Sequence, residues 1–112
     1  MKKTIFSLAF SFVSLGLQAK DPKTTQDTFK VWGNCGMCEK RIESAASKVK
    51  GVKTADWDED KGIMILTYDP SQTTPEHVQK AIAAAGYDTE MVKAEDNTYS
   101  KLPGCCQYKR KG

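Results

Sequence analysis

The chain has 112 residues, with 17 basic and 14 acidic side chains and a formal net charge of +3 at pH 7. This length predicts one compact domain, and the near-balance of charge gives no indication of nucleic-acid binding. The sequence contains no paired carboxylates, Ser–His pair or phosphate-binding loop that we can place, so we expect no enzymatic activity.

The N-terminus has the three parts of a secretory signal peptide. Residues 1–3 are positively charged, residues 4–17 are apolar and uncharged, and Ala19 is a small residue before a charged pair. The apolar run is shorter than the roughly 20 residues that span a bilayer. We therefore expect residues 1–19 to be a signal peptide cleaved after Ala19, and the protein to be periplasmic. Disulfides form in that compartment unless a metal or a reductase intervenes.

A polar, flexible leader is expected at residues 20–27. A first strand follows at residues 28–32, where Phe29 and Val31 share a face. A helix then begins near Cys38, and from Ile42 its apolar side chains recur at the spacing of one helix face.

Two strands are predicted next, at residues 52–58 and 63–68, joined by a hairpin turn at residues 59–62. The first residues of the second strand are apolar on both faces, so the pattern alone leaves open which alternate side chains face inward. The side chains that we expect to face inward are Ala55, Trp57, Met64, Leu66 and Tyr68.

A second helix begins at a capping box formed by Thr73 and Glu76 and ends at Gly86. Residues 89–92 are predicted as a fourth strand. The order βαββαβ predicts an α+β ferredoxin-like domain at residues 28–93, with two helices on one face of an antiparallel sheet.

Five motifs along this domain occur in an order typical of one metal-binding family. They are Cys35-Gly36-Met37-Cys38, Ile42 after the second cysteine, Lys50-Gly51-Val52, Tyr68-Asp69-Pro70 and Ala85-Gly86-Tyr87. With them, residues 28–92 resemble a heavy-metal-associated domain, the fold of copper chaperones, metal-ATPase N-terminal modules and periplasmic mercury-binding proteins. The sequence differs from the family pattern at Trp32-Gly33-Asn34, where such domains usually have Gly-Met-Thr. We expect the loop to pack differently there.

Cys35 and Cys38 are the primary candidate metal ligands. A helix N-terminus favours the thiolate form of a nearby cysteine. Thiolates select soft ions, so we expect Cu(I) first, with Hg(II), Zn(II) or Cd(II) as alternatives. Two protein ligands leave the ion open to a third, which predicts transfer by thiolate exchange.

The resemblance implies a protein that buffers metal, or delivers it to a membrane metal transporter or efflux system, as a monomer or a metal-bridged dimer. In related bacterial domains the Gly-Tyr loop lies beside the metal loop. Tyr87 is therefore a candidate neighbour of the ligands, and a core aromatic is the equal alternative.

Residues 94–112 are expected to form a flexible tail that contains Cys105 and Cys106. Adjacent cysteines seldom bond each other, because the ring is strained. They remain candidates for two roles: auxiliary metal ligands, or disulfide partners of Cys35 or Cys38.

Two other functions remain open. Trp32 followed by the Cys-x-x-Cys motif faintly resembles the thioredoxin sequence, which suggests a periplasmic thiol–disulfide redox protein. The tryptophan is displaced by two residues, however, and no proline precedes a strand that would face the dithiol. The second alternative is a small disulfide-stabilised domain without metal.

Overall fold

The computed structural model describes residues 24–112, so the expected signal peptide and residues 20–23 of the expected leader lie outside the described residues. The elements in chain order are β1 (Thr25–Lys30), α1 (Gly36–Ser47), β2 (Val52–Asp58), β3 (Ile63–Tyr68), α2 (Pro75–Ala84), α3 (Asp96–Ser100) and the short 3-10 turn η2 (Gly104–Cys106). Among residues 24–112, no helix combines the length and the apolar character that a membrane span requires.

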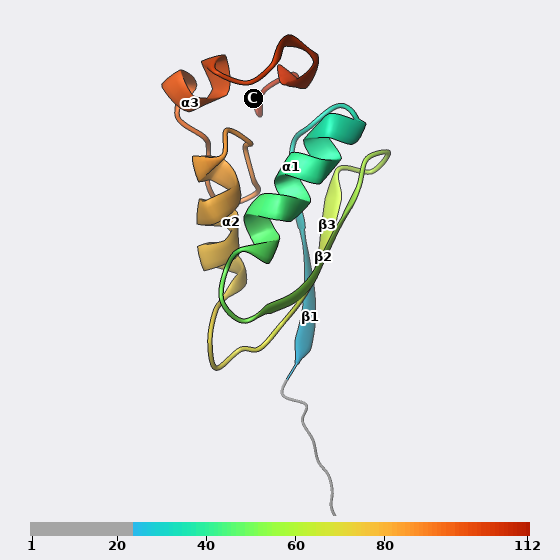
Figure 1. Ribbon diagram of the computed structural model, residues 1–112, viewed down its shortest axis with the longest axis vertical. Helices are drawn as coiled ribbons and strands as arrows, with labels where there is room; N and C mark the ends of the chain where they lie inside the picture. The colour runs from blue at the N-terminus through green and yellow to red at the C-terminus, as the bar shows by residue number, and fades with distance from the viewer. Residues whose placement is uncertain (1–23) are drawn as a thin grey trace, which may run out of the picture.

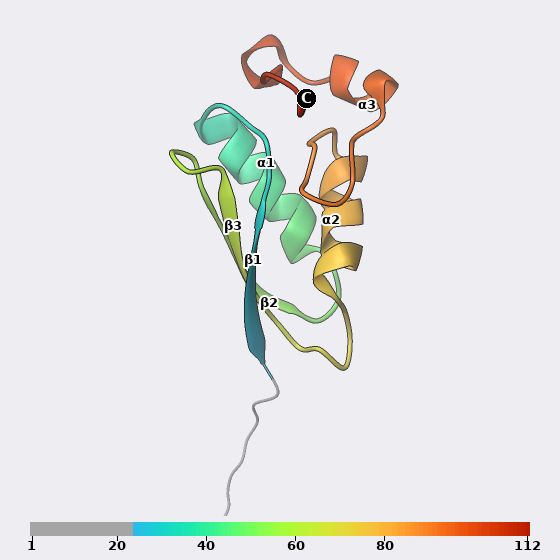
Figure 2. The same cartoon turned by 180° about the vertical axis from the view of Figure 1, so that it is seen from behind.

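The three strands form an antiparallel sheet in the order β1-β3-β2, with β3 in the centre. Figures 1 and 2 show α1 and α2 on the same side of this sheet. Met64 of β3 lies between Phe29 of β1 and Trp57 of β2, and all three side chains are buried. This arrangement confirms the predicted ferredoxin-like fold.

The inward-facing set that we favoured for β3 is confirmed, because Met64, Leu66 and Tyr68 are all buried. The capping prediction for α2 needs a correction. The N-cap is Thr74, whose side-chain oxygen accepts a hydrogen bond from the His77 amide at 3.1 Å. Thr73 lies one residue too early and is buried instead.

The first strand is longer toward the N-terminus than predicted. Residues 25–27, assigned to the leader, pair with β3, and the Tyr68 hydroxyl donates to the Asp27 carboxylate at 2.7 Å. Their side chains are exposed, so the apolar pattern carried no signal for this pairing.

The predicted fourth strand is reduced to one isolated bridge between Val31 and Thr89. The main chain closes on itself at this point, since the Thr89 amide donates to the Val92 carbonyl at 2.7 Å. The Thr89 hydroxyl also donates to that carbonyl and accepts from the Val92 amide. The ladder ends on both sides of the bridge, because the Lys30 amide donates to the Glu90 side chain and the Asp88 amide donates to the Tyr108 hydroxyl.

The C-terminal segment differs from the expected flexible tail. It contains α3 and η2, and it buries Leu102, Cys106 and Tyr108 in the core of the domain. We call residues 102–111 the strap. Figure 1 shows it across the end of the domain where α1 begins.

Two anchors hold the strap. The Tyr108 hydroxyl donates to the Gly86 carbonyl and accepts from the Asp88 amide, each at 2.8 Å. The Arg110 guanidinium donates to both carboxylate oxygens of the buried Asp88, also at 2.8 Å. Burial disfavours the charged form of Asp88, but the Arg110 pair and the backbone amides of Ala94 and Lys111 outweigh it, and the pKa of Asp88 is lowered.

Candidate metal site

The Cys-x-x-Cys loop joins β1 to α1. Cys35 has an extended backbone and occupies the N-cap position of α1, while Cys38 lies in the first helical turn. Their sulfurs are 3.7 Å apart. The loop rests on the core at Gly33, where an added Cβ would lie only 2.9 Å from the Trp57 ring. The indole of Trp57, itself held by a hydrogen bond to the Val31 carbonyl, thus supports the loop from below.

The two cysteines have different environments. Cys35 is half-buried, and the backbone amides at the start of α1, that of Cys38 first, lower the pKa of its thiol, although its sulfur makes no regular capping bond. Cys38 is fully buried, and burial raises the pKa of its thiol. Its sulfur donates to the Asn34 side-chain oxygen at 3.0 Å. The expected helix-terminus effect therefore prevails at Cys35, whereas burial overrides it at Cys38.

The strap brings the other two cysteines to this loop. The sulfurs of Cys35, Cys105 and Cys106 all lie within 4.8 Å of one another. The sulfurs of Cys105 and Cys106 are 3.9 Å apart, and Cys105 also lies 3.7 Å from the sulfur of Met37. All four cysteines are free thiols, so the structure contains neither of the disulfides considered for the tail.

Tyr87 lies beneath the thiols and is completely buried. Within the described residues, its hydroxyl has no hydrogen-bond partner of ordinary geometry. Burial is the main cause that raises the pKa of this hydroxyl, and the neighbouring Cys106 and Cys38 raise it further. Tyr87 is thus both a core aromatic and a neighbour of the Cys38 and Cys106 sulfurs.

The comparisons with known proteins agree with this geometry. The family model described as heavy-metal-associated domain matches residues 28–88. This chain belongs to the heavy-metal-associated domain family. The copper chaperone CopZ of Staphylococcus epidermidis (strain RP62A) is 36% identical to it over 67 residues, covering 59% of this chain and 98% of CopZ.

Two solved structures show the same fold for the heavy-metal-associated domain. One is a CopZ metallochaperone, 33% identical with a TM-score of 0.56, over 58% of this chain and 98% of the other. The second is oxidized MerP from Ralstonia metallidurans CH34, 32% identical with a TM-score of 0.57, over 60% of this chain and 94% of MerP.

The matched segment ends at residue 88, upstream of the strap. The strap residues that bring Cys105 and Cys106 to the loop, Tyr108 and Arg110, were not among our predicted site residues. Tyr108 could have been identified from the sequence, because it lies two residues after Cys106 and is, with Tyr99 and Leu102, one of the large apolar or aromatic residues of the tail. Arg110 gives no such signal.

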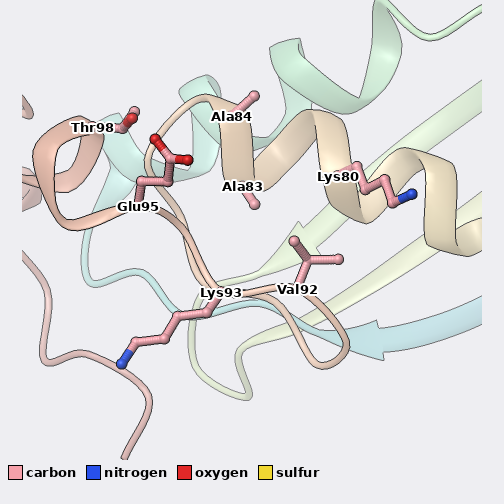
Figure 3. A pocket seen from close by; sticks show the side chains of 7 residues that line it. All are labelled: Lys80, Ala83, Ala84, Val92, Lys93, Glu95 and Thr98. Atoms are coloured by element: carbon pink, nitrogen blue, oxygen red, sulfur yellow. The ribbon is translucent and has the colours of Figure 1, made fainter.

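Two other features of the surface do not offer thiolates. Glu39, Glu43 and Asp56 place carboxylate oxygens within 4.8 Å of one another, a donor type suited to hard cations. One oxygen of Glu43 already accepts from the Trp57 amide at 2.8 Å. A hollow of about 370 Å³ lies between α2 and the chain leading to α3. Figure 3 shows its lining side chains, Lys80, Ala83, Ala84, Val92, Lys93, Glu95 and Thr98. These side chains include no soft-metal ligand.

Proposed function

We propose that this protein binds a soft metal ion through Cys35 and Cys38 and passes it on by thiolate exchange, with Cu(I) as the preferred ion and Hg(II) as the main alternative. The observation that carries the proposal is the pair of free sulfurs, 3.7 Å apart at the start of α1. A metal–sulfur bond is about 2.3 Å long, so two ligands on opposite sides of an ion are separated by about 4.6 Å. A small opening of the pair accommodates the ion.

The difference between the two thiols suits exchange. Cys35 is half-buried and has the lowered thiol pKa, so it is the thiolate that meets an arriving ion first. Cys38 is buried and gains its full charge only when the metal replaces its proton. The naming of the relative CopZ as a copper chaperone supports Cu(I) as the cargo.

We infer that the acceptor is a thiolate-bearing membrane metal transporter or efflux system, and that exchange takes place in the periplasm. The periplasmic location is supported by the signal-peptide pattern of residues 1–19. Docking at the start of α1 is supported by the exposure of that end, where the residue Met37 is 48% exposed. An incoming thiolate reaches Cys35 from this side.

Native mass spectrometry of the reduced protein, titrated with Cu(I), Hg(II) and Zn(II), tests the proposal. We expect a single tight adduct with Cu(I) or Hg(II) that is lost in a Cys35→Ser/Cys38→Ser double variant. A His77→Ala variant is the control, because His77 is the only histidine and lies exposed at the start of α2. Tight adducts that survive the double cysteine variant would refute the proposal.

A thiol–disulfide redox function is the second candidate. It is favoured by the lowered thiol pKa of Cys35 beside a second thiol at 3.7 Å. Absence of any stable metal adduct, together with a reversible mass change of two protons between reduced and oxidised protein, would favour this alternative.

A further inference from the structure

We propose that Cys105 and Cys106 of the strap join Cys35 in a three-thiolate site for a soft metal ion. This inference rests on the proposed function, since it concerns how the same ion is held. Two of the three proposed ligands, Cys105 and Cys106, lie beyond the matched family segment, which ends at residue 88. The strap would supply, within one chain, ligands that an open two-cysteine site lacks.

The sulfur positions fit three-coordinate binding. The three sulfurs lie within 4.8 Å of one another, and the Cys105 and Cys106 sulfurs are 3.9 Å apart. An ion with three bonds of about 2.3 Å holds its sulfurs about 4 Å apart. Cys38 belongs to the other pair, in which its sulfur lies 3.7 Å from that of Cys35. Cys35 is therefore shared by both arrangements.

The strap presents its thiols in fixed positions. Its Tyr108 hydroxyl is bonded on both sides, and its Arg110 forms a two-point ion pair with the buried Asp88. Leu102 and Cys106 are buried in the core. A ligand set that is ordered before metal arrives avoids the entropic cost of ordering a free tail at the moment of binding.

Tyr87 provides an independent indication. Its hydroxyl is fully buried beside Cys38 and Cys106 and lacks a hydrogen-bond partner within the described residues. A buried donor without an acceptor is unfavourable, and a hydrogen bond to a charged acceptor is among the stronger ones. A metal-bound thiolate at Cys106 keeps negative charge and would give this hydroxyl the acceptor that it lacks.

The two arrangements define an internal exchange step. An ion bound by Cys35 and Cys38 acquires bonds to Cys105 and Cys106 as its bond to Cys38 breaks. The two strap thiols release their protons to solvent, the Cys38 sulfur takes up one proton, and no electron is transferred. Release to a partner then requires that the partner's thiolates displace the strap, which makes the protein slower to give up metal than an open pair.

X-ray absorption spectroscopy of the Cu(I)-loaded protein counts the sulfur neighbours of the ion. We expect three in the wild type and two in a Cys105→Ser/Cys106→Ala variant that still binds Cu(I). Alanine is chosen at 106 because that side chain is buried, where a serine hydroxyl would need a partner. In competition with a Cu(I) chelator, we expect the affinity of this variant to fall at least about tenfold, the lower limit seen when only a partner of a metal ligand is removed.

Single variants separate ligands from neighbours. Cys105 is exposed, so Cys105→Ser alone removes one proposed ligand without changing the core. Met37→Leu is the matched control, because its sulfur lies 3.7 Å from that of Cys105 and is not assigned as a ligand. It should keep three sulfur neighbours. Cys35→Ser should weaken binding more than Cys38→Ser, since Cys35 belongs to both arrangements.

The outcomes separate this inference from the proposed function. Two sulfur neighbours in the wild type, three in the double strap variant, or loss of one neighbour in Met37→Leu would each overturn the three-thiolate site and leave the Cys35–Cys38 pair as the binding site. Absence of soft-metal binding by the wild-type protein would refute both.

Discussion

Tyr108 stacks on Tyr87, with ring centroids 5.5 Å apart and ring planes 18° from parallel. The contact joins the strap to the residue whose hydroxyl lies against Cys38 and Cys106. Aromatic pairs contribute about 0.5–1.5 kcal/mol beyond the area that they bury. The position of the strap and the floor of the cysteine cluster are therefore energetically coupled. The two hydroxyls differ, because that of Tyr108 makes two hydrogen bonds whereas that of Tyr87 has no partner within residues 24–112.

Tyr87→Phe should raise the free energy of unfolding of the metal-free protein by about 1 kcal/mol. The substitution keeps the stacked ring and removes a buried hydroxyl that has no partner within residues 24–112. Chemical denaturation under reducing conditions measures the change. A loss of stability would show that the hydroxyl is satisfied in the metal-free protein, for example by a thiol or a buried water.

Tyr108→Phe should have the opposite effect and lower the free energy of unfolding by about 2–4 kcal/mol. Removal of the Tyr108 hydroxyl leaves two buried backbone groups, the Gly86 carbonyl and the Asp88 amide, without their hydrogen-bond partner. The alkylation rate of the buried Cys106 should rise as the strap opens. Tyr68→Phe is the control: it loses one hydroxyl bond, to Asp27 on β1 and away from the strap, and should leave Cys106 protected. Equal protection of Cys106 in both variants would contradict this account of the anchor.

Acid should release the strap through Asp88. Its folded-state pKa is lowered, so its contribution to stability is fully present above the unfolded value of about 3.9 and is lost as the pH falls through the folded value. The groups that hold its charged form are the Arg110 guanidinium and the backbone amides of Ala94 and Lys111. The transition should therefore lie below about pH 4.

Fluorine NMR of protein labelled with 5-fluorotryptophan can follow this release. The Lys111 ammonium lies 5.5 Å from the Trp32 ring centre, so strap opening changes the Trp32 resonance, while the second tryptophan, Trp57, is buried in the core. Asp88→Asn should show the open Trp32 resonance already at pH 7. Asp96→Asn is the control, because Asp96 meets Arg110 only at the surface. An unchanged Trp32 resonance in Asp88→Asn would rule out this anchor.

The two strands at residues 52–58 and 63–68 could be predicted to the residue because glycine or proline marks their ends. Within these limits the buried Met64, Leu66 and Tyr68 recur at the period of a strand, although the apolar Ile63 and Ile65 on the other face leave the phase open. The position of the cysteine pair at the start of α1 followed in the same way from the helical pattern beginning near Cys38. Local periodicity is sufficient where an element buries one of its own faces.

The strap lacks such a pattern. Its place in the fold depends on pairs of residues that are about 20 positions apart, Tyr108 with Gly86 and Arg110 with Asp88. Contacts between residues so far apart leave no periodic pattern in the sequence. The same limitation applies to the fourth strand predicted at residues 89–92, where no sequence period indicates the turn that the Thr89 side chain closes.

Gly86→Ala should loosen the strap from below. Gly86 has φ of +110°, which costs a residue with a side chain about 1–2 kcal/mol, and an added Cβ would lie 3.0 Å from the Leu102 side chain. We expect a lower free energy of unfolding and faster alkylation of Cys106. Gly104→Ala is the matched control, because its Cβ would meet nothing within 4 Å. Protection of Cys106 equal to wild type in Gly86→Ala would show that Leu102 accommodates the methyl group.

Gly33→Ala and Gly36→Ala should change the free energy of unfolding in opposite directions. At Gly33, a Cβ would lie 2.9 Å from the Trp57 ring and 3.1 Å from Ile42, both buried and unable to move freely. The loop must shift away, which should cost about 1–3 kcal/mol and separate Cys35 from Cys38.

At Gly36, the first residue of α1, a Cβ meets nothing within 4 Å, and alanine is the better helix former by up to about 1 kcal/mol. Denaturation and Cu(I) competition measure both variants: we expect Gly33→Ala to lose stability and affinity, and Gly36→Ala to keep its affinity and gain stability. If Gly33→Ala kept wild-type affinity, the support of the loop by Trp57 would not determine the spacing of the two thiols.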